Sequence, residues 1–124
     1  MENKILETPN FDVEIKNGIL FAKYKSKITL EIAKASVKAR MELTLGKPLP
    51  VFIQMSDVKS ADKDARDFFS SDEGTKGVKA GAIFVDSVFY SFLGNFFLQV
   101  TKPKIPAKLF TDKEKAIKWL EQYK

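Results

Sequence analysis

The chain has 124 residues, of which 44% are hydrophobic and 30% charged, with a formal net charge of +5 at pH 7 and no Cys or His. This length supports one domain with a single core, and the composition is that of an ordinary globular protein. Thiol nucleophiles, Ser-His-Asp triads and most zinc or copper sites are excluded, because their nucleophile, base or ligands do not exist in the chain. We therefore expect no metal and no cofactor, and any catalysis would depend on Asp, Glu, Lys, Tyr or Ser alone.

Positive charge predominates, but its distribution does not favour a nucleic-acid partner. Of the 21 basic residues, two are Arg (Arg40 and Arg66) and the others are Lys, scattered among acids along the chain. Proteins that read bases and phosphates favour the bidentate guanidinium group of Arg, which is scarce here. We therefore expect a solvated, Lys-rich surface and no nucleic-acid partner.

The first ten residues, MENKILETPN, contain too short an apolar run for a signal peptide. Together with the absence of Cys, this predicts a cytoplasmic protein. No Pro/Gly/Ser-rich linker and no internal repeat divides the rest of the sequence. We expect an N-terminal segment at residues 1–10 and one domain at residues 11–124.

An alternating pattern opens the domain. Residues 11–16 alternate between apolar and charged side chains, as in a half-buried strand, and residues 19–22 form a second apolar run. Asn17 and Gly18 separate the two runs, and this pair is the strongest short-range hairpin signal because both residues tolerate positive φ. The sequence therefore predicts an antiparallel β-hairpin.

An amphipathic helix is expected next, with Thr29 as its N-cap and its last turn near Leu45. Gly46 provides a C-terminal cap, and Pro48 and Pro50 prevent the helix from continuing. The apolar stripe consists of Leu30, Ala33, Val37, Met41 and Leu45. Such a stripe indicates that the helix covers one face of a sheet.

Two short apolar runs predict central strands of that sheet. Residues 51–55 and 80–85 show no clear alternation, as expected of strands that are covered on both faces. Between them, Ser60 is predicted to cap a helix at residues 61–71. Residues 72–79 contain two glycines and predict a loop.

A window without any charged residue extends from Ser87 to Thr101. This window is shorter than the ~20 apolar residues that a helix needs to cross a bilayer, so we expect no membrane span. Its spacing predicts a helix with a wide apolar face. That face consists of Val88, Phe89, Phe92, Leu93, Phe96, Phe97 and Val100.

The C-terminal part predicts a strand at residues 107–110 and a helix from Asp112. Thr111 and Glu114 fit the T-x-x-E capping box, in which each side chain bonds the other residue's free backbone amide. The predicted inner face of this helix consists of Ala116, Ile117, Leu120 and Tyr123, with Trp119 beside it.

The order of these elements is two strands, then three helix–strand units, then a last helix. Helical crossovers between the later strands indicate a mixed sheet with helices on its faces. The sequence therefore predicts an α/β domain in which an N-terminal β-hairpin is joined to a mixed four- to five-stranded sheet with about four helices.

This order, with a hairpin first and crossovers after it, resembles the STAS domain of anti-sigma-factor antagonists. Two segments, GNFFLQVTKPKIPAKLFTDKEKAIKWL (Gly94 to Leu120) and DARDFF (Asp64 to Phe69), resemble a family of small uncharacterised STAS-like (SpoIIAA-like) bacterial proteins typical of Bacteroidetes. The resemblance covers most of the chain from about Phe11. It implies a single STAS-like domain.

Ser60 is a candidate phosphorylation or switch residue through this resemblance. In the antagonists, a partner kinase phosphorylates a serine in a D-S-S/T-G type loop after the central strand. Ser60 matches that serine by position, but the sequence KSAD from Lys59 to Asp62 lacks the second hydroxyl and the glycine. An unmodified N-cap explains the same residue without a switch.

Two carboxylates follow the predicted central strands. Asp57 and Asp86 would lie at the carboxyl ends of neighbouring parallel strands, where open α/β sheets place their sites. Such a pair could bind Mg²⁺ or act as acid and base, whereas acids in these positions are also common turn formers and caps. Without His, a second ligand cluster or a glycine-rich phosphate loop, we do not predict an enzyme.

The apolar window 87–101 has three alternative interpretations. Its wide face could be core, a homodimer surface, or the wall of a pocket for an acyl chain. The last alternative is encouraged by the similarity of STAS-like folds to CRAL-TRIO lipid carriers. Lys102, Lys104 and Lys108, which lie around two prolines, could contact an anionic headgroup or an acidic partner, or could be solubilising charges that protect an edge strand.

We therefore predict a non-enzymatic domain that binds protein partners and forms a homodimer. The alternative is a carrier or sensor of a small apolar or lipid ligand. The candidate contact residues for either role are Phe89, Phe92, Phe96, Phe97, Lys102 and Lys104.

Overall fold

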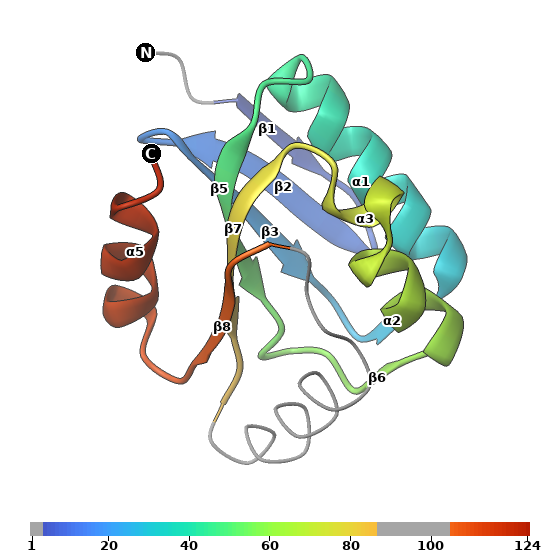
Figure 1. Cartoon of the computed structure of the whole chain (residues 1–124). Coiled ribbons are helices and arrows are strands. Elements are labelled where there is room, and N and C mark those ends of the chain that lie inside the picture. The colour runs from blue at the N-terminus through green and yellow to red at the C-terminus, as the bar shows by residue number, and fades with distance from the viewer. Residues whose placement is uncertain (1–3, 87–104) are drawn as a thin grey trace.

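A six-stranded mixed sheet organises the part of the chain that the structure, a computed structural model, describes: residues 4–86 and 105–124 (Figure 1). The strands lie in the order β1, β2, β3, β5, β7, β8. Their bounds are β1 Lys4–Glu7, β2 Phe11–Lys16, β3 Ile19–Tyr24, β5 Leu49–Gln54, β7 Val78–Phe84 and β8 Ala107–Phe110. The helices of the described residues are α1 Leu30–Thr44, α2 Lys63–Ser70, α3 Asp72–Thr75 and α5 Lys113–Glu121. The predicted α/β class with a mixed sheet is confirmed.

The antiparallel half of the sheet contains the predicted hairpin. Strands β2 and β3 pair antiparallel with Lys16 opposite Ile19, and both turn residues, Asn17 and Gly18, have positive φ. Strand β1 adds an antiparallel edge beside β2. Strand β1 was not predicted, and the expected number of strands was four or five, because all four residues of β1 are exposed and show no apolar alternation.

The parallel half confirms the two predicted central strands. Strand β5 lies between β3 and β7, and all three run parallel. Strand β8 pairs parallel with β7 and forms the other edge. Parallel strands need long crossovers, and α1 and α2 provide these between successive strands of the described chain.

Helix α1 begins as predicted, because the Thr29 hydroxyl accepts a hydrogen bond from Ile32 N at 3.2 Å. Of its predicted stripe, Ala33 and Val37 are buried. Leu45 is 82% exposed, so its assignment to the stripe was wrong. Leu45 adopts left-handed backbone angles just past the helix end, which turn its side chain away from the apolar face.

The predicted cap at Ser60 was also wrong. Ser60 and Ala61 form a short strand, β6, which pairs parallel with β4 at Lys27–Ile28. This pairing holds Ser60 in an extended conformation, and helix α2 begins only at Lys63, after Asp62. The predicted loop at residues 72–79 contains the short helix α3, capped by Ser71, and the start of β7.

The capping box at the last helix was wrong by one residue. The N-cap of α5 is Asp112, whose Oδ1 accepts a hydrogen bond from Lys115 N at 3.1 Å, so Thr111 and Glu114 do not form the predicted pair. The predicted inner face is confirmed, since Ala116 and Leu120 are fully buried.

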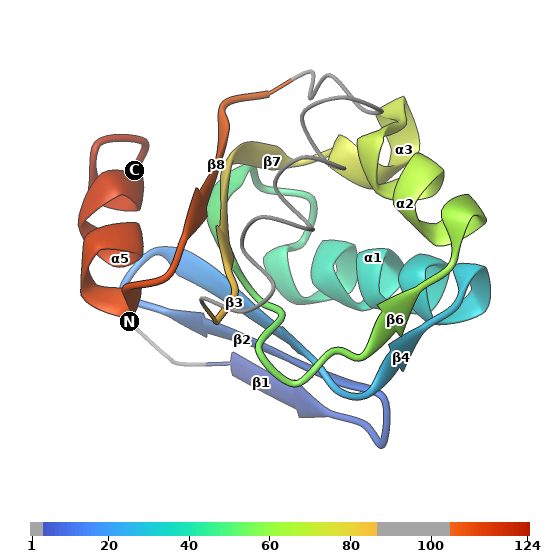
Figure 2. The same cartoon turned by 90° about the horizontal axis from the view of Figure 1, so that it is seen from below.

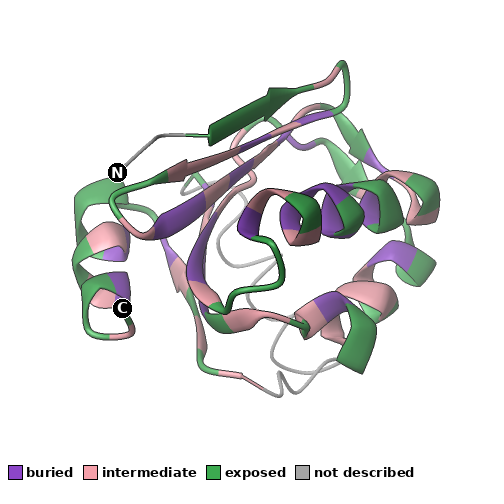
Figure 3. Ribbon diagram, turned by 90° about the horizontal axis from the view of Figure 1, so that it is seen from above, coloured by how far each residue is buried: buried purple, intermediate pink, exposed green. Residues whose placement is uncertain are grey.

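Helices cover both faces of the sheet and create two apolar clusters. Figure 2 shows α5 on one side of the sheet and α1, α2 and α3 on the other. The cluster under α5 includes Phe52, Ala80, Ala82 and Leu120. The cluster under α1 and α2 includes residues from β2 and β3 together with Ala33 and Ala65, and Figure 3 shows that buried positions lie where these helices face the sheet.

Candidate functional site

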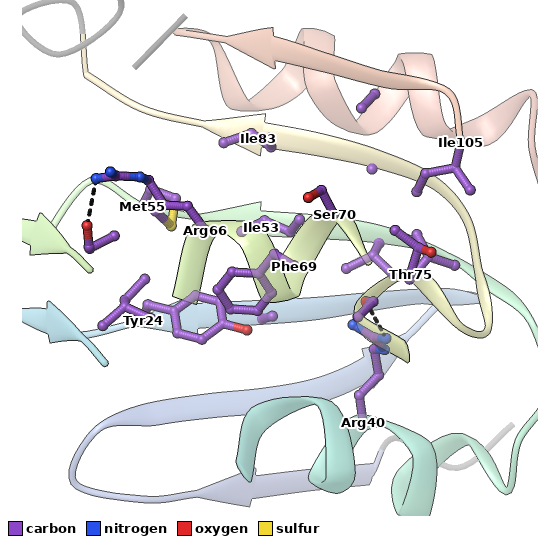
Figure 4. A pocket seen from close by; sticks show the side chains of 18 of the residues that line it. Tyr24, Arg40, Ile53, Met55, Arg66, Phe69, Ser70, Thr75, Ile83 and Ile105 are labelled. Carbon is purple, nitrogen blue, oxygen red and sulfur yellow. Dashed lines mark hydrogen bonds between the residues drawn. The ribbon is translucent and has the colours of Figure 1, made fainter. Parts of the chain in front are cut away.

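A pocket of about 160 Å³ lies between the sheet and the helices α1 to α3. Figure 4 shows its lining from close by. Most of the lining is aliphatic and comes from β3, β5, β7 and β8 on the sheet side: Ala22, Val51, Ile53, Val78, Gly81, Ile83, Ala107 and Leu109. The described residues that add polar side chains are Tyr24, Arg40, Arg66, Ser70 and Thr75.

The pocket owes part of its space to small residues on the sheet. Gly81 lies at the level of Val51 on one side and Ala107 on the other, so the centre of the sheet carries little side-chain volume there. A Cβ atom added to Gly81 would meet only one described atom within 4 Å, Ile53 Cδ1 at 3.8 Å. Engineered apolar cavities of about 150 Å³ bind benzene, so this pocket has room for a small apolar molecule.

Both arginines of the chain line this pocket. Arg40 on α1 is only 8% exposed, and its Nη2 donates to Gly74 O at 3.0 Å and to Lys76 O at 2.9 Å. Its Nε is buried and has no hydrogen-bond partner among the described residues. Arg66 on α2 donates from Nη1 to Ala61 O at 2.8 Å. Burial lowers the pKa of the Arg40 guanidinium, although Arg retains its proton at physiological pH.

Tyr24 lies beside these groups at the end of β3. Its hydroxyl is 2.7 Å from Ser36 Oγ, and because Ser36 donates its own proton to Ala33 O, the Tyr24 hydroxyl is the donor to Ser36. Burial raises the pKa of Tyr24, while the bond to Ser36 and the charge of Arg40 act in the opposite direction. Tyr24 is therefore neutral at physiological pH and does not balance the positive charge of Arg40.

The predicted switch residue, Ser60, lies shortly before helix α2 but does not cap it, because the N-cap position is Asp62. Ser60 is exposed on β6, opposite Lys27 of β4. Because it does not cap a helix, the structural explanation that competed with a switch no longer applies. Phosphorylation of Ser60 stays a prediction.

The predicted carboxylates follow the neighbouring parallel strands β5 and β7, as the sequence indicated. Both Asp57 and Asp86 are exposed. Asp57 forms an ion pair with Lys23, with Nζ and Oδ2 3.6 Å apart. Within residues 4–86 and 105–124, no group of three or more Asp or Glu side chains is arranged to hold a metal ion.

The candidate contact residues of the apolar window lie outside the described residues. These are Phe89, Phe92, Phe96, Phe97, Lys102 and Lys104. In the part of the chain that the structure describes, no helix is long and apolar enough to cross a membrane.

The residues that give the pocket its charge and its space, Arg40, Tyr24 and Gly81, were not predicted from the sequence. Arg40 was noted only as one of two arginines, and Tyr24 and Gly81 carried no motif. The sequence did contain one signal for Arg40. In a chain with two Arg and many Lys, an Arg suggests a position that requires the hydrogen-bonding geometry of a guanidinium group. The sequence could not show that both positions line the same pocket.

Comparisons with known proteins agree with this fold. The structure is similar to that of an uncharacterised protein of the DUF3478 family, with a SpoIIAA-like fold, from Shewanella loihica PV-4. The TM-score is 0.59 and the sequence identity 19%, over 96% of this chain and 92% of the other. The predicted SpoIIAA-like fold is thereby confirmed, and nothing matched among curated proteins. The family model of a domain of unknown function, DUF7793, matches residues 13–124, so the chain belongs to that family.

Proposed function

We propose that this protein binds a small, mainly apolar ligand in the pocket between the sheet and helices α1 to α3, as a carrier or sensor. The observation that supports this role is the pocket itself, about 160 Å³ of space with an aliphatic lining. Protein interiors are otherwise packed as closely as organic crystals and contain few voids larger than a water molecule. Ligand sites are typically concave and apolar with a few polar groups, which is the composition of this lining.

We propose that this role does not involve catalysis. The chain has no His or Cys to act as a base or nucleophile near neutral pH. Polar groups of the pocket bond to neighbouring protein groups, as Tyr24 does to Ser36 and Arg66 to Ala61. Such an arrangement suits binding and orientation of a ligand more than chemistry on it.

Filling the pocket should abolish ligand binding. In Gly81→Val, the new side chain occupies space above the sheet, where a Cβ meets only Ile53 Cδ1 among the described atoms. We expect 1-hexanol to shift the NMR methyl signals of Ile53, Ile83 and Leu109 in the wild type and to leave them unchanged in Gly81→Val. The two proteins should have the same fold by circular dichroism.

Lys108→Val is the matched control. Lys108 is exposed on the neighbouring strand β8 and alternates with the pocket residues Ala107 and Leu109, so its side chain points to the other face of the sheet. Wild-type binding of 1-hexanol should persist in this variant. Methyl signals that do not respond in the wild type, or that respond equally in Gly81→Val, would contradict the pocket role.

Protein binding, including formation of a homodimer, is the second candidate function. The observation in its favour is strand β1, an edge strand in which Ile5 is 55% exposed and Leu6 39% exposed. Exposed edge strands have unpaired backbone groups and can add a strand from another chain. A dimer formed in this way would continue the sheet of one copy into the next.

A charge on β1 should weaken such a dimer. We expect Ile5→Lys to lower the dimer fraction in native mass spectrometry by about tenfold, because Lys on an edge strand opposes strand addition. Leu45→Lys is the control, since Leu45 is also apolar and is 82% exposed, but lies at the end of α1. Equal dimer fractions in the wild type and in Ile5→Lys would count against self-association through β1.

A further inference from the structure

The pocket contains a buried positive charge without a described counter-charge. Arg40 is 8% exposed, and the described lining of the pocket contains no Asp or Glu. The neighbouring Tyr24 is neutral, because burial raises the pKa of its hydroxyl. A buried charge is costly unless it is paired and hydrogen-bonded, and the two carbonyl groups that bond Arg40 offer partial charges alone.

We infer that the ligand of this pocket is a small organic anion, such as a carboxylate with a short apolar body, whose acidic group binds Arg40. This inference rests on the proposed function and specifies its ligand. The acidic group would provide the counter-charge that the described lining lacks. The apolar body would lie on the aliphatic sheet residues, among them Ile53 and Ile83.

The donors of Arg40 suit this role. A guanidinium group has five N–H donors. The Nη2 group of Arg40 bonds the carbonyl oxygens of Gly74 and Lys76, while Nε is buried without a partner among the described residues. Figure 4 shows Arg40 reaching from α1 toward α3 beside Thr75, with Ile53 and Ile83 across the pocket. Arg40 and the aliphatic side chains of Ile53 and Ile83 therefore lie on opposite sides of the pocket.

A purely structural role for Arg40 is the competing explanation. Its two bonds attach the end of α3 to α1, and Nη2 alone makes both of them. A structural role does not require Nε or a counter-charge, whereas an anion site uses both. The use of Arg in a chain otherwise rich in Lys fits either role, since Arg is the preferred cation for buried ion pairs and for carboxylate recognition.

The test compares two probes with the same chain length, hexanoate and 1-hexanol, by NMR titration of the wild-type protein at pH 7. Both probes can accept a hydrogen bond from the charged guanidinium, but only hexanoate brings the counter-charge, so hexanoate should bind about tenfold more tightly than 1-hexanol. The Arg40 Nε–H signal should shift with hexanoate only. Because the chain has two Arg, the variant Arg66→Lys removes one of two such signals and assigns the other.

The variant Arg40→Met should bring the ratio of the two affinities close to one. If Arg40→Met does not fold, the Arg40 Nε–H signal and the affinity ratio of the wild type still test whether an anion binds Arg40. Equal affinities in the wild type, or an Arg40 signal that hexanoate leaves unchanged, would overturn the anion inference while the pocket role stands. Failure of both probes to bind the wild type would overturn the proposed function, and the anion inference with it.

Discussion

Replacing Phe52 with alanine is expected to lower the free energy of unfolding by about 4 kcal/mol, the usual cost of removing a buried phenyl ring. Phe52 is 1% exposed and lies at the middle of β5, under α5. Its ring centroid is 5.4 Å from that of Phe21 and 5.8 Å from that of Phe84, so the ring joins three adjacent strands. Urea denaturation followed by circular dichroism measures the change.

Phe68→Ala is the matched control for this prediction. Phe68 is also aromatic but is only half-buried on α2, at the margin of the other cluster. Its loss should cost about 1 to 2 kcal/mol, since less apolar surface returns to water. If Phe52→Ala were no more destabilising than Phe68→Ala, the packing of α5 against β5 described above would be wrong.

The sequence predicted the elements whose signals are local. Asn17 and Gly18 specify the hairpin because their backbone angles suit the tight turn wherever the hairpin lies in the fold. Residues 11–16 alternate because the face of β2 away from α1 carries Asp12, Glu14 and Lys16 in the described structure. Strands β5 and β7 do not alternate because helices cover them on both faces.

The failed predictions depend on contacts between distant segments. Serine is a common N-cap residue, so Ser60 was predicted to cap a helix. In the structure, pairing of β6 with β4 holds its backbone extended, and no local sequence pattern predicts that pairing. At the last helix, two adjacent residues, Thr111 and Asp112, both suit an N-cap, and the structure uses Asp112. Side-chain propensity alone does not decide between such neighbours.

The pocket could not be predicted from the sequence, for a physical reason. Its lining comes from strands and helices that are up to 87 residues apart, from Ala22 to Leu109. A void arises from the positions of whole elements relative to one another, which periodicity within one element does not determine. Arg40 illustrates this point, because it is buried where the end of α3 contacts α1, two elements that are 28 residues or more apart along the chain.

The contact between α2 and α3 depends on the absence of a side chain at Gly74. A Cβ atom at this buried position would press against Phe68 O and would lie 2.8 Å from Phe69 Cα, both backbone atoms of α2. No rotamer change can relieve such a clash, so α3 would have to move away from α2. Because Gly74 O also accepts a hydrogen bond from Arg40, this movement would weaken a charged hydrogen bond as well.

Gly74→Ala is therefore expected to lower the free energy of unfolding by about 3 kcal/mol, through overpacking and the weakened bond to Arg40. The higher helix propensity of Ala would recover at most about 1 kcal/mol, so the clash decides the sign. Gly81→Ala is the control, because its Cβ meets Ile53 Cδ1 at an ordinary 3.8 Å and its φ is not in the left-handed region. Its stability should equal that of the wild type or exceed it by up to about 1 kcal/mol, as is usual for Gly→Ala at a compatible site. If urea denaturation gave the same free energy of unfolding for Gly74→Ala and Gly81→Ala, α3 would not pack on α2 through Gly74.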